Sequence, residues 1–203
     1  MATTYNNNLR IAEIGTGDQA GVWGNTTNTN LGTLLESAIA GYTSVAIASA
    51  NQALTYLNGP TSTASANQSV RAILTLSTTT GANFAVYAPP VSKQYTVYNS
   101  SLYTATVYNS TSIGNTTAAG TGVAIPAGEV MTVWAGGTNF YQQNTYFNGA
   151  SINNATLASP TMTGTPLAPT ASPGTNTTQV ANTAFVVASF APLASPALTG
   201  NPT

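Results

Sequence analysis

The spacing of apolar residues near the N-terminus predicts one short amphipathic helix. In "LGTLLESAIAG" (residues 31–41) the apolar side chains recur at intervals of three and four, so that they share one helical face. Asn28 or Asn30 could cap the start of this helix, and Gly41 suits the position just after its end. A helix of about three turns is marginal alone, so its apolar face must pack on another surface. The face consists of Leu31, Leu34, Leu35, Ala38 and Ile39.

The segment from residue 42 to residue 147 has the pattern of short β-strands. Runs rich in β-branched and aromatic residues alternate with turn signals such as "TTTG", "PAG" and "GG". The phrase "TVYNS" occurs at 96–100 and again at 106–110, which suggests consecutive strands of a meander. We therefore predict an antiparallel, sandwich-like or barrel-like β domain, with residues 43–54 left open between helix and strand. The predicted strands are 70–76, 83–88, 94–99, 102–109, 122–125, 129–135 and 139–143.

The last segment, residues 148–203, repeats itself. The phrase at 157–166 returns at 193–202 with Leu, Ala, Ser, Pro, Thr and Gly at matching positions, an offset of 36 residues. Between the copies, "NTTQVANTAFVVASF" could form a helix capped by Asn176, with Gln179 three residues later. A fixed period of this kind indicates a repeat architecture, and we divide the chain into residues 1–41, 42–147 and 148–203.

One such repeat has few large apolar side chains for its length. Ordering each residue costs roughly 1–2 kcal/mol, and each buried apolar side chain returns about 1.5–3 kcal/mol. A disordered linker and a compact monomeric fold are the alternatives, but association of identical chains best fits the regular spacing of Pro, Thr and Gly in the repeat. Such a shaft would be a homo-oligomer that buries Leu157, Met162, Val180, Ala184, Val187, Leu193 and Leu198.

Charge is scarce, which excludes several functions. Only 3% of the 203 residues are charged, the net charge is −1, and no charged residue follows Glu129. The chain lacks the basic patch that nucleic acid requires and a basic amphipathic face for an anionic membrane. No apolar run is long enough to span a bilayer. The N-terminus does not resemble a secretion signal, so we expect synthesis in a cytoplasm.

The residue types that carry most chemistry are also absent. There is no histidine and no cysteine, which removes the usual base, thiolate nucleophile and soft metal ligands. Glu13 and Asp18 could meet in one loop, although a capping role or a pair with Arg10 is the simpler interpretation. Glu36 follows Thr33 at the spacing of a capping box or faces solvent. We expect no enzyme activity, no cofactor and no metal site.

The aromatic residues leave two interpretations open. Eight of them interleave with the predicted strands, where they could form a sugar-stacking surface or pair across strands in the sheet core. Trp23 lies in a Gly/Asn-rich loop beside the helix, where it could fill a local core or anchor the chain to a partner. The eight are Tyr87, Tyr95, Tyr98, Tyr103, Tyr108, Trp134, Phe140 and Tyr141.

Three stretches resemble proteins of tailed-bacteriophage fibres. "ASPTMTGTPLAPTASPGTNTTQVANTAFV" (158–186) closely resembles a repeat of phage tail fibres. "GDQAGVWGNTTNTNLGTLLESAIAG" (17–41) is similar to an N-terminal segment of virion fibre proteins, and "VAIPAGEVMTVWAGGTNFYQ" (123–142) to a β-hairpin phrase in them. Since such fibres usually continue into a receptor-binding tip, we also expect these residues to be part of a longer polypeptide.

The resemblance implies a structural virion protein. Such a protein would be a homotrimer, docked on the phage tail by its N-terminal part and projecting a distal host-recognition tip. The β domain would form a collar, and the repeats would begin the shaft. A glycan-binding module or a head fibre or decoration protein remains the alternative. The expected docking residues are Trp23, Leu31, Leu34, Leu35 and Ile39.

Overall fold

The computed structural model describes residues 2–58, 66–145, 161, 164, 167–172, 183 and 186. The chain divides into two compact units, Met1–Gly149 and Ala150–Thr203. The first two predicted parts thus lie within one unit, and the division of the chain into three parts stays a prediction.

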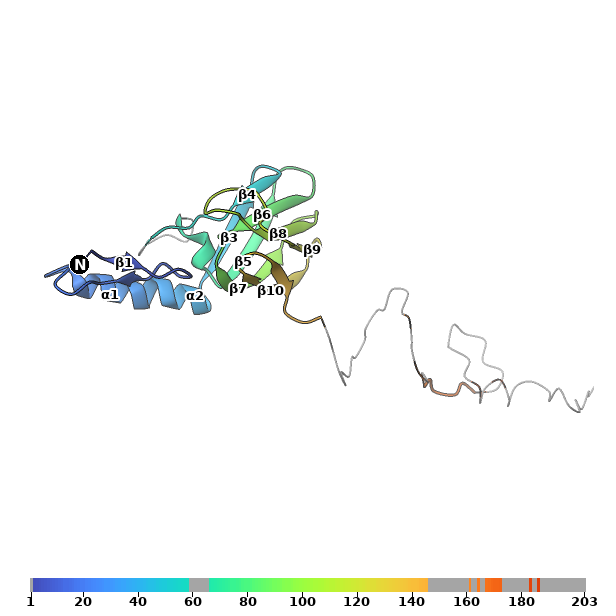
Figure 1. Ribbon diagram of the computed structural model, residues 1–203. Coiled ribbons are helices and arrows are strands. Elements are labelled where there is room, and N and C mark those ends of the chain that lie inside the picture. Colours follow the sequence, from blue (N-terminus) through green and yellow to red (C-terminus); the bar gives the residue numbers. More distant parts are fainter. Residues whose placement is uncertain are drawn as a thin grey trace, which may run out of the picture. The chain divides into compact units, whose positions relative to one another are not determined.

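The first unit begins with a small hairpin and a helix that lie side by side (Figure 1). Strands β1 (Thr4–Tyr5) and β2 (Ala12–Glu13) pair antiparallel. The helix follows as three continuous pieces, α1 (Trp23–Thr29), the π-helical turn η1 (Asn30–Leu35) and α2 (Glu36–Ala40). The predicted helix therefore exists, but it begins at Trp23.

Asn30 explains why the predicted helix start is wrong. It lies in the middle of the helix, and its buried side chain accepts a hydrogen bond from the Ala12 amide (3.1 Å) and donates one to the Ala12 carbonyl (2.8 Å). The amide thus binds a backbone group of β2 instead of capping the helix. The capping box expected from Thr33 and Glu36 is also not formed, because the chain is already helical before Thr33.

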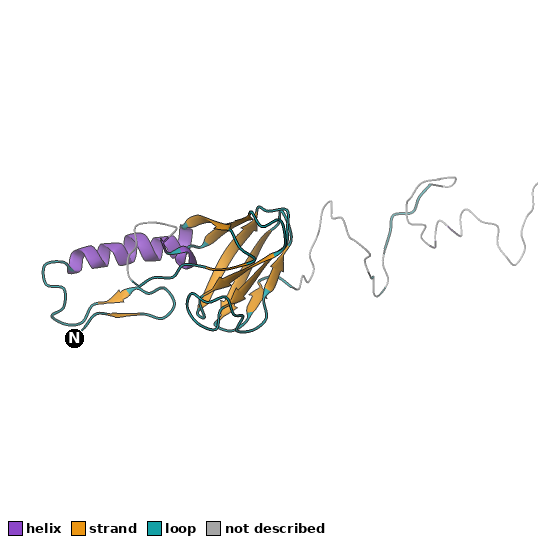
Figure 2. Ribbon diagram, turned by 90° about the horizontal axis from the view of Figure 1, so that it is seen from above, coloured by secondary structure: helices purple, strands orange, loops and turns teal. Residues whose placement is uncertain are grey.

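The remaining strands form two sheets that face each other across one core (Figure 2). The first sheet has the order β11-β10-β7-β5-β3, and the second has the order β4-β6-β8-β9. All seven strands predicted from the sequence are present, and residues 43–54 provide two more. The bounds are β3 Tyr42–Ile47, β4 Asn51–Ala53, β5 Ile73–Thr78, β6 Phe84–Ala88, β7 Ser92–Asn99, β8 Ala105–Asn109, β9 Val123–Ile125, β10 Val130–Gly136 and β11 Phe140–Gln142.

The prediction of an antiparallel domain is wrong for the first six of these strands. The chain passes from one sheet to the other with each strand, so β3, β5 and β7 pair in parallel, as do β4, β6 and β8. Within the two sheets the antiparallel pairs are β7 with β10, β10 with β11 and β8 with β9, at one end of each sheet. The two "TVYNS" strands, β7 and β8, consequently lie in opposite sheets and are not paired as a meander. Strands β3 to β8 thus form a short coil, and the antiparallel strands β9, β10 and β11 close it.

The core lies between the two sheets and is formed by the alternate side chains of each strand that point inward. In β3 every second side chain is buried, and the register stacks the inward residues of successive coils, as in Val45 beside Leu76 and Leu74 beside Val97. Tyr95 is the largest fully buried side chain; its ring stacks on Phe140 and its hydroxyl donates to the Ser69 carbonyl (2.9 Å). Because the apolar residues have the same spacing on neighbouring strands, the register brings them into contact.

The helix is joined to the coil by polar contacts. Arg71 follows a short 3-10 helix (Gln68–Val70) and donates from its guanidinium to the Ser37 hydroxyl (2.5 Å) near the end of α2. The Ala72 amide donates to the Ser37 carbonyl (3.1 Å). The cation thus lies where the helix dipole is negative, which favours the contact.

Few residues of the second unit are described. Thr183 and Val186 are helical, within the stretch for which the sequence suggested a helix, and Leu167 is exposed. The predicted shaft residues Leu157, Met162, Val180, Ala184, Val187, Leu193 and Leu198 all lie outside the described residues. The shaft therefore stays a prediction.

Candidate binding surfaces

The helix presents an apolar surface to solvent, which we call the helix stripe: Leu31, Leu35 and Ile39. These residues recur every four positions, and Ile39 is 73% exposed. Trp23, at the start of the helix, is 61% exposed. Glu36 is the only charged residue of the helix. A neutral aliphatic row with nothing packed on it among the described residues is a candidate protein-docking surface.

Leu34 does not belong to this surface. Its side chain is 1% exposed and lies, with Asn30 and Ser37, on the buried side of the helix. The intervals of four and three between these residues place them on one side of the helix, and Asn30 binds that side to Ala12 of β2. The other four predicted docking residues stay candidates, and Trp23 is not the local core residue that one interpretation allowed.

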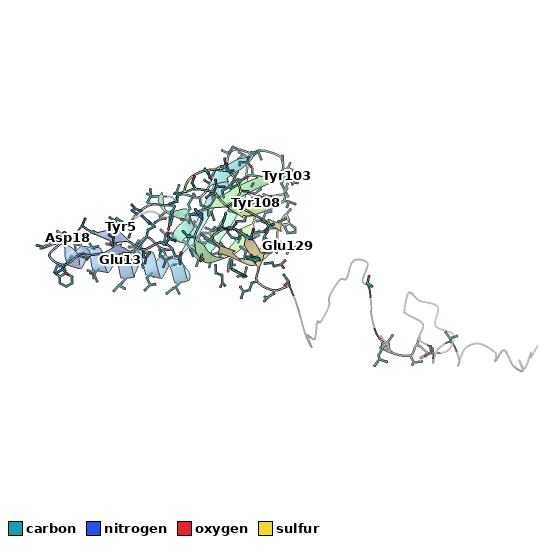
Figure 3. All side chains as sticks on the ribbon, viewed as in Figure 1. Tyr5, Glu13, Asp18, Tyr103, Tyr108 and Glu129 are labelled. Atoms are coloured by element: carbon teal, nitrogen blue, oxygen red, sulfur yellow. The ribbon has the colours of Figure 1, made fainter. Side chains whose placement is uncertain are left out.

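Two carboxylates near the N-terminus, those of Glu13 and Asp18 (Figure 3), accept hydrogen bonds from hydroxyl groups. Glu13 accepts a hydrogen bond from Thr4 (3.0 Å), and Asp18 accepts one from Thr3 (3.4 Å). Arg10 forms no ion pair with either among the described residues; it lies over the Tyr5 ring and donates to Asn58 (2.7 Å). This arrangement resembles structural hydrogen bonding more than a pair of catalytic carboxylates.

The eight aromatic residues separate into four groups. Tyr95 and Phe140 are core residues, and Tyr87 and Tyr108 stack on each other on the second sheet, with Tyr87 largely buried. Tyr103 is half-buried in the loop before β8. Tyr98, Trp134 and Tyr141 are exposed. The core interpretation thus holds for some of the aromatics, and the surface interpretation remains for three.

These three residues lie on the side of the first sheet that faces away from the core, which we call the outer sheet face. Strand alternation places on it the side chains between the buried positions of each strand. None of these side chains is charged. They are Tyr42, Ser44 and Ala46 on β3, Ile73, Thr75 and Ser77 on β5, Gln94, Thr96 and Tyr98 on β7, Val130, Thr132 and Trp134 on β10, and Tyr141 on β11.

Sequence reasoning could not assemble this face. Its aromatic residues were visible as strand residues, but the pairing that brings β7, β10 and β11 side by side joins segments up to about fifty residues apart. The usable signal was the alternation itself, because Gln94, Thr96 and Tyr98 occupy every second position of one predicted strand.

Lys93 is an inward-facing cation at the start of β7. Its ammonium lies 4.6 Å from the centre of the Tyr95 ring and donates to the Gln94 carbonyl (3.3 Å). Burial lowers the pKa of Lys93 to about 8, and burial raises the pKa of Tyr95 above its usual value. No carboxylate is paired with this lysine among the described residues.

The stability of the protein should therefore rise between about pH 8 and pH 10. In that window the unfolded chain keeps Lys93 protonated while the folded chain has released the proton, so the free energy of unfolding increases with pH. Above pH 10 the trend should reverse, because Tyr95 ionises only in the unfolded chain. Urea unfolding at stepped pH measures this. Lys93→Met should flatten the rise, and an unchanged rise in that variant would contradict the assignment.

No group of three or more His, Cys, Asp or Glu side chains that could hold a metal ion occurs among the described residues. None of their helices is long and apolar enough to cross a membrane.

Comparison with known proteins finds similarity over a short stretch of the chain. The chain is 64% identical over 39 residues to a probable tail fiber protein of Escherichia phage P2. The match covers 19% of this chain and 6% of the relative, so it spans only a small part of that protein. No family model and no solved structure matches the chain. A short stretch of the chain is thus similar to a virion component, which supports a structural role in a tail fibre in coarse terms.

Proposed function

We propose that the chain is the virion-proximal part of a homotrimeric phage tail fibre. The N-terminal module docks on a tail protein, the two-sheet coil forms a collar, and the second unit begins the shaft that carries a distal host-recognition region. The observation that carries this proposal is the 39-residue similarity to a probable tail fiber protein. The proposal assigns the chain no catalytic step, cofactor or nucleic-acid partner.

The helix stripe supports the docking step. Leu31, Leu35 and Ile39 form a neutral row on a helix whose opposite side is already packed on its own hairpin. Burial of apolar area stabilises such a contact by about 25 cal/mol per Å², and salt does not screen this contribution. Docking should therefore persist at high ionic strength.

Reconstitution on virions tests the docking step. Purified protein is added to tails that lack their fibres, and co-sedimentation is measured at low and at high salt. Leu35→Asp with Ile39→Asp should abolish binding, whereas Asn28→Asp, which places a charge at an exposed polar position of the same helix, should not. Binding that is lost at high salt, or that survives the double substitution, would contradict docking through the helix stripe.

The oligomeric state is tested separately. Light scattering on the full chain should give three times the mass of the 20.5 kDa protomer. A stable monomer at all concentrations would overturn the trimer, and with it the shared shaft core. Recovery of the chain in washed phage heads rather than tails would favour a head decoration protein instead.

A further inference from the structure

We propose that the outer sheet face binds a neutral oligosaccharide, which lies across the strands between two aromatic ridges. This binding function goes beyond the structural role proposed above and does not depend on it. It is carried by the register of β7, β10 and β11 and by the absence of charge on the face.

The first ridge is a fixed aromatic pair. Trp134 of β10 lies opposite Tyr141 of β11, and their rings stack with centroids 4.3 Å apart at an interplanar angle of 23°. Both side chains are 42% exposed. Because the two rings are already held against each other, little side-chain entropy is lost when a ligand packs on their exposed part.

The second ridge lies further along the same strands. Tyr98 of β7 is opposite Val130 of β10, and both side chains are exposed. Val130 and Trp134 are four residues apart on one strand, which separates the two ridges by about 13 Å at 3.3 Å per residue. Between them, Thr96 is opposite Thr132, so a row of hydroxyl groups forms the floor.

Amide groups border the floor. The Gln94 amide donates to the Gln143 side-chain oxygen (3.1 Å), which leaves the side-chain oxygen of Gln94 and the amide nitrogen of Gln143 for a ligand. A hollow of about 310 Å³ adjoins this region and is lined by Val130, Met131, Thr132, Gln142 and Asn144. Hydroxyl and amide groups next to aromatic surface are the groups that hold a polar ligand in a fixed orientation.

The pattern favours a sugar over a protein partner. A pyranose ring has apolar C–H faces and a rim of hydroxyl groups, which matches aromatic ridges on either side of a hydroxyl floor. A stable protein interface has a continuous apolar centre, often with arginine, whereas here a row of threonines interrupts the apolar positions. The face carries no Lys or Arg to pair with a carboxylate or phosphate, so the sugar should be neutral.

Fluorescence of the full chain tests the proposal. Trp23 and Trp134 are the only tryptophans, so Trp23→Phe leaves Trp134 as the single reporter beside the ridge. Titration with a panel of neutral oligosaccharides, including maltohexaose and chitohexaose, should give a saturable change in emission with at least one of them. An oligomer of sialic acid serves as the anionic comparison and should bind more weakly.

Calorimetric titration with the same sugar then locates the site. Trp134→Ala and Tyr141→Ala should each weaken binding by about fivefold, since one aromatic contact contributes about 1 kcal/mol. Trp23→Ala, which removes an exposed ring elsewhere, should leave the affinity unchanged. The unfolding midpoints of all variants show that each is folded.

Three results would overturn the proposal. They are the absence of saturable binding across the neutral panel, tighter binding of the anionic oligomer, and equal affinity of the parent and Trp134→Ala. Self-association that the Trp134→Ala substitution abolishes would show that the face is an interface between copies of the chain. None of these outcomes bears on docking through the helix stripe, which is measured on tails.

Discussion

Asn99→Ala should lower the free energy of unfolding by about 3 kcal/mol or more. The side chain is fully buried, and its amide donates to the carbonyls of Tyr103 (2.7 Å), Ile125 (2.9 Å) and Pro126 (3.1 Å). Its oxygen accepts from the Ser101 amide and hydroxyl. Removal leaves several buried backbone groups without partners at the corner where β7 leaves for the second sheet. Chemical denaturation followed by circular dichroism measures the loss.

Asn109 provides a matched control within the same protein. It occupies the position in the second "TVYNS" phrase that Asn99 occupies in the first and is also buried, but neither its amide nitrogen nor its oxygen has a hydrogen-bond partner among the described residues. Asn109→Ala removes two unpaired polar groups and opens a small cavity, which nearly offset each other. The change should stay within about 1 kcal/mol. Equal losses for the two substitutions would show that the two asparagines do not differ as the structure describes.

Gly41→Ala should destabilise the joint between the helix and β3 by about 2 kcal/mol or more. The residue follows the last helical residue, as expected from the sequence, and its φ of −71° and ψ of 137° are angles that any amino acid can adopt. The requirement is steric: a Cβ here would lie 2.5 Å from the Ser37 carbonyl oxygen and 2.6 Å from the Ser37 Cα. These are backbone atoms that cannot rotate away. Hydrogen exchange of residues 23–47 and the unfolding free energy measure the effect.

Gly32→Ala is the control for this substitution. It lies in the same helix, and a Cβ there would meet nothing within 4 Å. The exchange of glycine for alanine in a helix contributes up to about 1 kcal/mol of stability. The two variants should therefore change stability in opposite directions, and a loss of the same size in both would contradict the steric explanation.

The strands show which features of the fold the local sequence pattern predicts. The alternation of apolar and polar residues and the β-branched composition located all seven predicted strands to within a few residues. Each strand buries the side chains of one of its faces, whichever strand it pairs with. The same signal could not say that β7 and β8 lie in opposite sheets. A chain that turns at Asn99 can return as a hairpin or cross to the facing sheet. The crossing is accompanied by contacts with distant segments, such as those of Asn99 with Ile125 and Pro126 and the pairing of β8 with β6.

For the candidate surfaces, too, the sequence predicted some features and not others. The sequence located the apolar residues of the helix stripe, but it grouped Leu34 with them because a regular helix places residues 31, 34 and 35 on one face. Leu34 instead lies on the same side as Asn30, whose contacts with Ala12 turn that side toward the hairpin. The outer sheet face required the register of strands far apart in the chain.

By itself the sequence determined the elements, the shortage of charge and the absence of histidine and cysteine, because these depend on composition and on neighbours within a few residues. The tertiary structure alone decided the parallel coil, the inward turn of Leu34, the steric need for Gly41 and the different environments of Asn99 and Asn109. Each depends on backbone groups brought together from distant segments, and local spacing does not encode which distant group will be the partner.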